Sequence, residues 1–515
     1  MILTGLKLLA WLLALAALVT LASWSAYRSY RRFARQARGP GSTALPCGEP
    51  KTALDQMFAP LEAANPGQSG LANLLDNSDA FAARALSAQA AGRSLDLMYY
   101  IWRTDITGWL LLAELMAAAD RGVRIRLLLD DVNVQGFDPA FLALNQHPNI
   151  AVRLFNPTRN RGNVIRRVLE MLLGMTRFNR RMHGKLWIAD GRLAILGGRN
   201  IADSYFGALE GGARNARDAD VMLTGAKVAE VSAVFDSYWN LGLALPILTL
   251  WPHFRINTGR FRRRLARHAG TSAARRFHTQ SLGGRAPTQI AARLHWTDHV
   301  QVLADPPEKA YGQRTEPWMS DAIAALLDEA KREVRLITPY FVPGDPGLEH
   351  FAALARRGVR VRLLTNALAA TDHVLVHGAY RIYRGPLLTA GAIIHEFAPP
   401  PPPGGRRDVL HSKVFIIDGR QAVVGSLNLD LRSALTNTEL GLQFEQPELV
   451  AELLAHFDHL TAPDQAYALA LNDGRLHWSV TRPGLPTRLD VEPEARWRMR
   501  ALSWIIGHLP IHGYL

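Results

Sequence analysis

"MHGKLWIADGRLAILGGRN", residues 182–200, places a histidine, a lysine and a terminal amide inside an otherwise apolar stretch. Two short apolar runs flank Asp190-Gly191, a dipeptide that is typical of tight β-hairpin turns. Side chains at positions i and i+2 of a strand point to the same face, so His183 and Lys185 share one face. The stretch therefore predicts a hairpin that presents polar groups, rather than two plain core strands.

The same pattern occurs a second time in "LHSKVFIIDGRQAVVGSLN", residues 410–428. Both copies read H-x-K, four residues, D, six residues, then G-[GS]-x-N. A single copy is readily explained as a chance pattern on a surface strand. Duplication with every polar position in register argues strongly against chance, and it indicates two related halves.

Matching segments upstream of the two motifs extend the repeat. "RGVRIRLLLDD" begins at Arg121 and "RGVRVRLLTNA" at Arg357, and each follows a helical pattern that itself follows an apolar strand. Strand, helix and strand in this order predict parallel pairing through a right-handed crossover. We therefore predict an α/β fold of two α/β/α halves. The expected divisions are a membrane anchor with a basic flank at 1–38, a first half at 39–245, an irregular basic linker at 246–300, a second half at 301–460, and a C-terminal tail at 461–515.

The N-terminal segment is apolar enough to cross a membrane. From Leu8 to Tyr27, 20 residues carry no charge, which is the length of a transmembrane helix. A cleaved signal peptide is the alternative, but Trp24 and Tyr27 resemble interfacial anchors and no small-x-small cleavage pattern follows. Five arginines without an acid come next, so by the positive-inside rule we expect the body of the protein in the cytoplasm. These arginines are Arg28, Arg31, Arg32, Arg35 and Arg38.

The net charge and the cysteine content limit which partners and which kinds of metal or disulfide site are possible. The formal charge of +14 and the pI near 10.2 predict an anionic partner, and nucleic acid, anionic lipid and phosphorylated substrates all fit. The single cysteine, Cys47, excludes an internal disulfide framework and a cysteine-rich metal site. His373 and His377 lie four residues apart but lack a third ligand nearby, so we expect helix or pocket residues there. No metal and no cofactor are expected.

Two further segments suggest a lipid surface. "NVIRRVLEMLLGMTRFNRR", residues 163–181, and "RWRMRALSWIIGHLPI", residues 496–511, alternate apolar clusters with arginines at helical spacing. Such helices lie in the membrane interface or pack on the protein, and the sequence leaves both readings open. Five consecutive prolines, residues 399–403, predict a stiff loop at the rim of the second motif.

Each motif offers the groups that a phosphate oxyanion needs. Folding back on the Asp-Gly turn brings small residues near each histidine, which leaves room for a ligand, and an asparagine ends the hairpin. One imidazole, one ammonium and one amide then surround an empty space. The residues expected to bind substrate phosphate are Asn200, Asn428, Gly198 and Ser426.

Two copies that face each other would place one histidine on either side of a phosphorus atom. In-line displacement needs this arrangement, with a nucleophile on one face and an acid for the leaving oxygen on the other. A neutral imidazole can attack phosphorus and form a phosphohistidine without a metal. Each histidine also needs an acid that orients its ring, and the candidates are Asp220 and Glu439.

The paired pattern resembles the HKD motif of the phospholipase D superfamily. Segments such as "GGRNIADSYFGA", "YFVPG" and "ATDHVLVHGAYRIYR" extend the resemblance over residues 65–510 to bacterial cardiolipin synthases of the C type. This resemblance implies a duplicated phospholipase D-like fold with one active site shared by the halves. It also implies ping-pong phosphatidyl transfer through a phosphohistidine.

The resemblance also assigns roles to the motif residues. His183 corresponds to the usual nucleophile and His411 to the general acid and base, while the motif aspartates more often support the fold than touch substrate. The catalytic motif set is His183, Lys185, Asp190, His411, Lys413 and Asp418.

The expected activity is cardiolipin synthesis at the bacterial inner membrane, by transfer of a phosphatidyl group to phosphatidylglycerol. The donor is left open, with phosphatidylethanolamine as one candidate, and so is the need for a partner protein. Hydrolysis to phosphatidic acid is the first alternative. A nucleic-acid phosphodiesterase is less favoured, because the chain has an anchor and no dedicated nucleic-acid module. An inactive scaffold is disfavoured by the two intact motifs.

Overall fold

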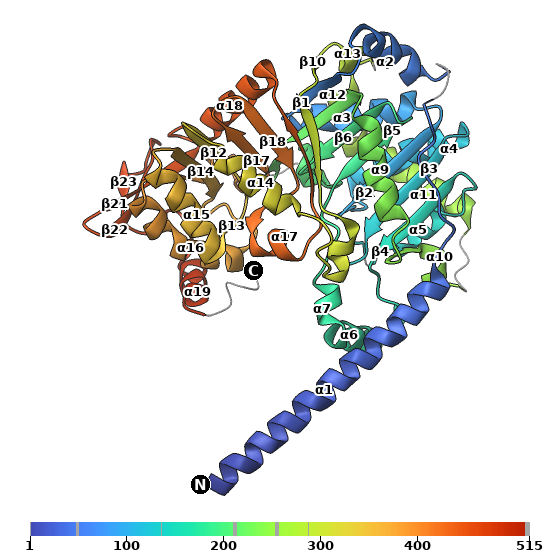
Figure 1. Cartoon of the computed structure of the whole chain (residues 1–515). Coiled ribbons are helices and arrows are strands. Elements are labelled where there is room, and N and C mark those ends of the chain that lie inside the picture. Colours follow the sequence, from blue (N-terminus) through green and yellow to red (C-terminus); the bar gives the residue numbers. More distant parts are fainter. Residues whose placement is uncertain are drawn as a thin grey trace.

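The computed structural model describes residues 2–47, 51–134, 136–209, 214–252, 257–286 and 288–509. Two large β-sheets form the centre of the molecule, one from each half of the chain. Figure 1 shows the first half in blue to green and the second half in yellow to red, beside one another.

The first sheet has nine strands. In spatial order they are β10 (His295–Thr297), β1 (Ser69–Leu74), β8 (Asp220–Gly225), β6 (Leu193–Gly197), β5 (Leu186–Ala189), β2 (Ser94–Tyr99), β3 (Arg124–Asp130), β4 (Ile150–Phe155) and β9 (Ala244–Pro246).

The second sheet has ten strands. In spatial order they are β11 (Val300–Ala304), β20 (Leu440–Phe444), β18 (Gln421–Gly425), β17 (Val414–Ile417), β12 (Glu333–Ile337), β14 (Arg360–Asn366), β15 (Ile393–Phe397), β21 (Ala466–Asn472), β22 (Arg475–Ser479) and β23 (Arg488–Leu489).

The two sheets repeat one topology. The run from β1 to β9 in the first sheet corresponds strand for strand to the run from β11 to β21 in the second. The three strands β2, β3 and β4 are parallel, and so are β12, β14 and β15, as the strand-helix-strand pattern predicts. The predicted duplicated α/β fold is therefore confirmed.

Helices cover both faces of each sheet, which gives two α/β/α halves. One apolar core lies under the outer helices of the first half, and a second lies under those of the second half. A third core joins the inner faces of the two sheets with α9 (Val228–Trp239) and α18 (Pro447–Leu460). The outer helices include α3 (Asn77–Ala90), α4 (Ile106–Asp120) and α5 (Asp138–Leu144) on the first sheet, and α14 (Met319–Asp328), α15 (Gly344–Arg356) and α16 (Val374–Thr389) on the second.

The segment expected to be an irregular linker is largely helical. Phe277 lies edge-on to Phe81 with ring centroids 4.8 Å apart, and His268 stacks on Trp109 at 4.5 Å. Apolar side chains at helical spacing face the first core while the arginines face outward, so amphipathic packing orders this segment. Residues 253–256 and 287 lie outside the described part. The helices are α10 (Ile247–Leu250), α11 (Thr258–Ala269), α12 (Ser272–Leu282) and α13 (Thr288–Ala291).

The segment after residue 460 also belongs to a half rather than to a free tail. Strands β21, β22 and β23 extend the second sheet, and α19 (Trp497–Gly507) packs against α16. Residues 510–515 lie outside the described part. Trp497, Trp504 and Ile505 of α19 are nevertheless exposed, as the interfacial reading requires.

Helix α6 (Val164–Leu173) is the most exposed apolar element of the body. Its side chains Ile165 and Leu172 are 80% and 64% exposed, and no residue of this helix is buried. Asn163 caps its first turn by accepting a hydrogen bond from the N–H of Arg166. Short helix α7 (Met175–Phe178) follows and leads directly into the first motif.

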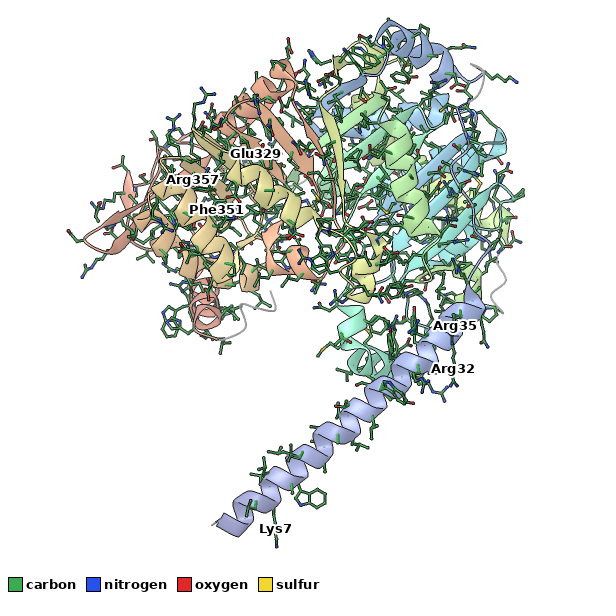
Figure 2. All side chains as sticks on the ribbon, viewed as in Figure 1. Lys7, Arg32, Arg35, Glu329, Phe351 and Arg357 are labelled. Carbon is green, nitrogen blue, oxygen red and sulfur yellow. The ribbon has the colours of Figure 1, made fainter. Side chains whose placement is uncertain are left out.

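Helix α1 (Ile2–Ala37) projects from the body as a single long arm (Figure 1). Its residues Thr4–Ala37 form a helix that is long and apolar enough to cross a membrane. The C-terminal end of the helix packs on the body through Tyr30, Ala34 and Ala37, which are buried. Figure 2 labels Lys7 near the free end and Arg32 and Arg35 near the body.

Candidate active site

Each motif forms the hairpin that its sequence predicts. Strand β5 pairs with β6, and β17 pairs with β18, both antiparallel. Asp190 and Gly191 turn the first hairpin with φ values of 55° and 65°, and Asp418 and Gly419 turn the second with 54° and 66°. Glycine and aspartate tolerate this left-handed backbone better than most residues do, which explains the shared Asp-Gly dipeptide.

The two motif aspartates hold the hairpins in place. Asp190 accepts hydrogen bonds from three backbone N–H groups at residues 92–94, and Asp418 does the same at residues 331–333, over distances of 2.7–3.2 Å. Each carboxylate thereby ties its hairpin to the start of the neighbouring central strand, β2 or β12. Their grouping with the catalytic residues is therefore corrected to the supporting role that the resemblance implies.

His183 is paired with a carboxylate from the other half of the chain. An isolated parallel bridge joins Met182 to Thr438, and it brings the next residues, His183 and Glu439, together. The Nδ1 atom of His183 lies 2.8 Å from Oε2 of Glu439, and both side chains are buried. A carboxylate at Nδ1 fixes the orientation of the ring and leaves Nε2 for chemistry.

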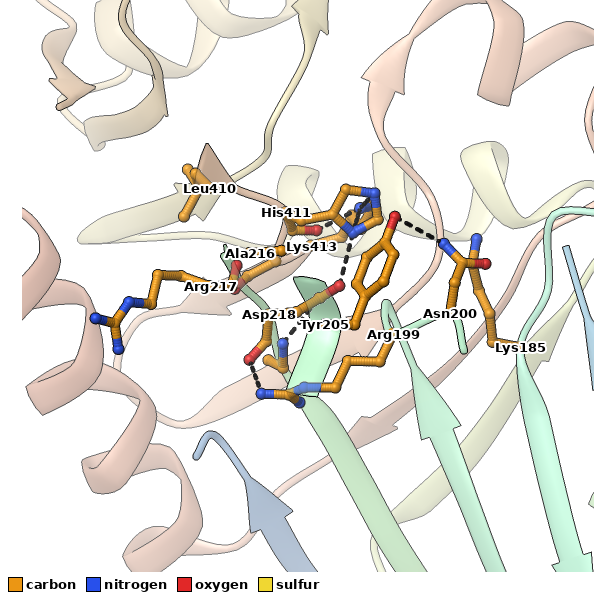
Figure 3. Close-up of polar contacts among 12 residues, drawn as sticks. Lys185, Arg199, Asn200, Tyr205, Ala216, Arg217, Asp218, Leu410, His411 and Lys413 are labelled. Atoms are coloured by element: carbon orange, nitrogen blue, oxygen red, sulfur yellow. Dashed lines mark hydrogen bonds and ion pairs between the residues drawn. The ribbon is translucent and has the colours of Figure 1, made fainter. Parts of the chain in front are cut away.

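His411 has the reciprocal arrangement. The short strand β7 (Ala216–Arg217) pairs in parallel with β16 (Val409–Leu410), so the following residues, Asp218 and His411, meet. The Nδ1 atom of His411 lies 2.6 Å from Oδ2 of Asp218. Figure 3 shows this contact together with Lys413 and Tyr205. Because the acids are exchanged between the halves, both motifs contribute to one site.

Asp220, which we expected to orient a histidine, has different partners. Its carboxylate pairs with Arg84 at 2.8 Å and with Arg199 at 3.4 Å, and all three side chains are buried. This buried cluster joins α3 to β8 and stabilises the first half. The acid beside His411 is Asp218, two residues earlier, so the assignment of Asp220 was wrong.

Sheet register explains which acid takes the orienting place. Gly197 of the first motif lies opposite Asp220, which follows Asp218 by two residues. Gly425 of the second motif lies opposite a glycine that follows Glu439 by two residues. The two orienting acids therefore occupy equivalent positions, each two residues before the partner of the motif glycine.

Gly198 and Ser426 make room for these acids rather than for a ligand. A Cβ atom at Gly198 would lie 2.1 Å from Oδ1 of Asp218. Ser426 donates its hydroxyl hydrogen to Oε2 of Glu439 at 2.5 Å. The acids fill the space that we expected to remain empty, so the assignment of both small residues to phosphate binding is corrected.

The two asparagines end their hairpins in equivalent surroundings. Asn200 donates from Nδ2 to the hydroxyl of Tyr205 at 3.0 Å, and Asn428 donates from Nδ2 to the hydroxyl of Ser433 at 3.4 Å. Each partner lies five residues after its asparagine. Each amide therefore uses one of its two N–H groups on the protein, and phosphate binding by the other stays a prediction.

Lys185 and Lys413 are buried beside the histidines. The Nζ atom of Lys185 lies 2.5 Å from the carbonyl oxygen of His183, and the Nζ atom of Lys413 lies 2.9 Å from Nδ1 of His411. Burial lowers the pKa of Lys185 to about 7 and that of Lys413 to about 8. Buried ammonium groups in this position favour an anionic ligand, because a negative charge offsets the cost of their burial.

The same positive charges help to lower the pKa values of both imidazoles. Burial is the largest cause that lowers the pKa of His183 well below its ordinary value, and the charges of Lys185 and Lys413 add to it. Burial and Lys413 also lower the pKa of His411, but there Asp218 opposes the shift. The two rings are thus electrostatically unequal, with His183 the more strongly held in its neutral form.

The pKa values of the two orienting acids, Glu439 and Asp218, are shifted in opposite directions. Burial raises the pKa of Glu439. Burial also acts to raise the pKa of Asp218, but the charges of His411 and Lys413 outweigh it and the net shift is downward. Asp218 is therefore the better counter-ion, and its histidine is the one better able to carry a proton.

Two tyrosine rings contact the histidines, and sequence reasoning missed both. Tyr100 lies edge-on to His183 with centroids 4.9 Å apart, and Tyr205 lies edge-on to His411 at 5.1 Å. The only sequence signal for Tyr205 was its place five residues after the motif asparagine. Tyr100 follows the last residue of β2, far from the motif in sequence, so only the fold brings it to the site.

His377 belongs to a buried ionic cluster and not to the histidine pair. Its Nε2 atom lies 2.8 Å from the guanidinium of Arg384, which also pairs with Glu396 at 2.8 Å and Glu492 at 2.6 Å. His377, Glu396 and Glu492 approach closely enough to suggest a metal site. The guanidinium already supplies the positive charge at their centre, so this cluster is explained as a structural ion pair.

Known proteins share both the sequence and the fold. The family model described as "Cardiolipin synthase, PLD-like domain" matches residues 86–239 and 323–461. Cardiolipin synthase C of Escherichia coli (strain K12) is 34% identical over 90% of this chain and 99% of its own length. A cardiolipin synthase of Geobacillus kaustophilus is 27% identical over 77% of this chain and 68% of its own length.

Among solved structures, the phosphatidylserine synthase of Haemophilus influenzae Rd KW20 has a TM-score of 0.55. It covers 78% of this chain and 87% of its own, and at 15% identity it supports the fold alone. The family match includes both hairpins and both orienting acids. The chain therefore belongs to the cardiolipin synthase family with a phospholipase D-like domain, and it is an enzyme of the phosphatidyltransferase type.

Proposed function

We propose that this enzyme makes cardiolipin by transferring a phosphatidyl group from a phospholipid donor to a hydroxyl of phosphatidylglycerol. The observation that carries the proposal is the histidine pair. Each ring has a buried carboxylate from the opposite half at Nδ1, and two buried lysines lie beside the rings. This arrangement suits a phosphodiester placed between two imidazoles.

In the first step, Nε2 of His183 attacks the phosphorus of the donor. A phosphorus–nitrogen bond forms and the bond from phosphorus to the head-group oxygen breaks. His411 begins this step as an imidazolium with Asp218 as its counter-ion, and it gives its Nε2 proton to the departing oxygen, which leaves as an alcohol. The lowered pKa of His183 supports its role as nucleophile, because only the neutral ring can attack.

In the second step, a hydroxyl of phosphatidylglycerol gives its proton to Nε2 of His411, and its oxygen attacks the phosphorus. The phosphorus–nitrogen bond breaks and His183 is restored. Lys185 and Lys413 stabilise the charge on the phosphate oxygens in both steps. Transfer exceeds hydrolysis only if water is kept from the phosphohistidine while a second lipid is held in line.

We also propose that α1 spans the bacterial inner membrane with the body on the cytoplasmic side. The helix is long enough to span the bilayer, and the arginines after its apolar stretch favour the cytoplasmic side for the body. The exposed apolar side chains of α6 and α19 then rest in the interface. Phospholipids are the expected partners, and nucleic acid is not.

Product analysis in vesicles tests the activity. The full-length protein in vesicles of phosphatidylglycerol and phosphatidylethanolamine should yield cardiolipin as the main product and phosphatidic acid as the minor one. His183→Ala and His411→Ala should each remove essentially all turnover, because residues that act as a unit give non-additive losses. Phosphatidic acid as the dominant product in every lipid mixture would identify a hydrolase instead. Half the normal rate in either variant would mean two independent sites.

A further inference from the structure

A cavity of about 480 Å³ lies where the end of α1 meets the enzyme body. Its wall on the α1 side is basic and aromatic, and its opposite wall comes from the segment before the first motif and from η1 (Pro307–Tyr311). No residue of the histidine pair, its lysines or its acids lines it. The lining includes Arg31, Arg35, Arg38, Arg177, Arg180 and Tyr311.

The positive charge of this cavity is not balanced by the protein. Among the residues that the structure describes, no carboxylate lines the cavity. Arg177 forms an ion pair with Glu170 at 3.5 Å. Within the described part of the chain, the other four arginines form no ion pair. Four unpaired guanidinium groups around one space repel one another, so an anion bound between them would be stabilised.

The body wall is preorganised. Arg180 donates to the carbonyl oxygens of Lys309 at 3.1 Å and Leu435 at 3.2 Å, which holds its side chain without neutralising its charge. Burial lowers the pKa of Arg180, as expected for a charge that lacks a counter-ion. Arg177 lies between the rings of Tyr30 and Phe178 at 3.4 and 3.8 Å. Arg177 and Arg180 are therefore held in place by the body, whereas Arg31, Arg35 and Arg38 of α1 are exposed.

The cavity lies at the depth of lipid head groups. Trp24 and Tyr27 mark the end of the apolar stretch of α1, and aromatic residues of this kind settle at the membrane interface. Helix α6 contacts α1 nearby and exposes its apolar side chains. Figure 2 shows Arg35 at the junction of α1 and the body.

We propose that this cavity binds the head group of an anionic phospholipid, with its acyl chains lying along the apolar surface of α1. The phosphate would sit among the four unpaired arginines, and Tyr311 would contact it from the body wall. The site is separate from the histidine pair and would hold a second lipid outside the reaction. The inference rests on the membrane placement of α1 and not on the transfer chemistry.

Lipid retention by the purified full-length protein in detergent tests the site. A His183→Ala background stops turnover, so bound lipid can be counted by native mass spectrometry during titration with phosphatidylglycerol or phosphatidylcholine. Arg31→Gln with Arg35→Gln removes two charges from the cavity. The control pair, Arg28→Gln with Arg32→Gln, removes two charges from the same helix at positions that do not line the cavity. We expect the first pair to weaken retention of phosphatidylglycerol by about tenfold or more and the second by less than about twofold.

Three outcomes would overturn the proposal. Equal losses in both pairs would mean a general basic belt, and equal retention of phosphatidylcholine would mean a site without charge selectivity. Binding of inorganic phosphate as strongly as the lipid would mean a site for free anions. Arg180→Gln tests the body wall and should weaken retention in the same way, with thermal unfolding as the check on folding. Because the background has no turnover, failure of cardiolipin synthesis would leave this result unaffected.

Discussion

Each histidine of the site presents Nδ1 to a buried carboxylate, which leaves Nε2 as the reacting atom. His411 lies beside Asp218, whose pKa is lowered, and His183 lies beside Glu439, whose pKa is raised. An imidazolium is better stabilised by an acid that stays ionised. This difference supports His411 as the proton carrier and His183 as the nucleophile.

Replacing the acid beside His411 should slow turnover without unfolding the protein. In Asp218→Asn the amide cannot stabilise an imidazolium, so we expect kcat to fall by about 10²- to 10⁴-fold, the range for general acid–base catalysis. The matched control is Asp220→Asn, which breaks the buried contact to Arg84. The control should lower the temperature of thermal unfolding and act on rate only through lost folded protein. A large loss of kcat in folded Asp220→Asn, with little change in Asp218→Asn, would return Asp220 to the site.

We expect kcat/KM to decline on its alkaline side, because His411 loses the Nε2 proton that the first step needs and the two lysines lose their charges. Their pKa values of about 7 and about 8 mean that Lys185 and Lys413 lose their protons as pH rises through this range in the free enzyme. Substrate capture by an anion site should therefore decline above pH 7. On the acid side, the lowered pKa of His183 keeps the nucleophile neutral below pH 6.5, so activity should persist there. A rate that rises steadily to pH 9 would contradict this assignment.

At the scale of elements, the two hairpins carry the histidines. Backbone pairing between the two halves of the chain places an acid beside each histidine. Strand β7 meets β16, and Met182 meets Thr438, so each half supplies the backbone that seats the other half's histidine. The Asp-Gly turns lie at the other end of the hairpins from the histidines. Their role is to hold β5 and β17 in place on the central strands.

Removing a turn carboxylate should lower stability and spare the chemistry. Asp190→Ala leaves three backbone N–H groups without their acceptor and puts alanine at a φ of 55°. We expect the free energy of unfolding to drop by about 1–3 kcal/mol for the lost acceptor. Asp190→Asn keeps an acceptor and tolerates the left-handed backbone, so it should be milder. Denaturant unfolding and kcat per folded molecule measure the two effects, and a large loss of kcat in folded Asp190→Ala would return this residue to the catalytic set.

At the scale of the whole molecule, α1 is both an arm and part of the core. Tyr30, Ala34 and Ala37 are buried on the body, whereas the apolar residues before them are exposed. A truncation that removes the whole helix would therefore open the core. A truncation before residue 28 removes the exposed arm and its contacts with α6 but keeps these buried residues.

Deleting residues 1–27 should release a folded body that still binds anionic vesicles. The exposed apolar side chains of α6 and α19, with their arginines, supply this binding, which should weaken as salt is raised. Vesicle sedimentation at low and high ionic strength measures it, with uncharged vesicles as the control. A deletion protein that ignores anionic vesicles at low salt would show that these helices do not face the membrane.

Much of this protein follows from local pattern. The duplicated motif predicted two halves, the strand-helix-strand order predicted the parallel strands, and Asp-Gly predicted both hairpin turns. These features depend on residues close together in the chain, where side-chain periodicity and backbone preference act directly. The expected span follows in the same way from the uninterrupted apolar stretch of α1.

Tertiary structure alone decided how the halves complete each other. Asp218 and Asp220 are alternate residues with the same local character, and only pairing with a strand from the other half selects the first for His411. Gly198 and Ser426 looked like space for a ligand, but acids distant in sequence fill that space. Residues 246–300 looked like a linker because their apolar side chains become buried only where the helices pack on the first core. Contacts between distant segments depend on strand register and on packing, and neither can be predicted from a local sequence pattern.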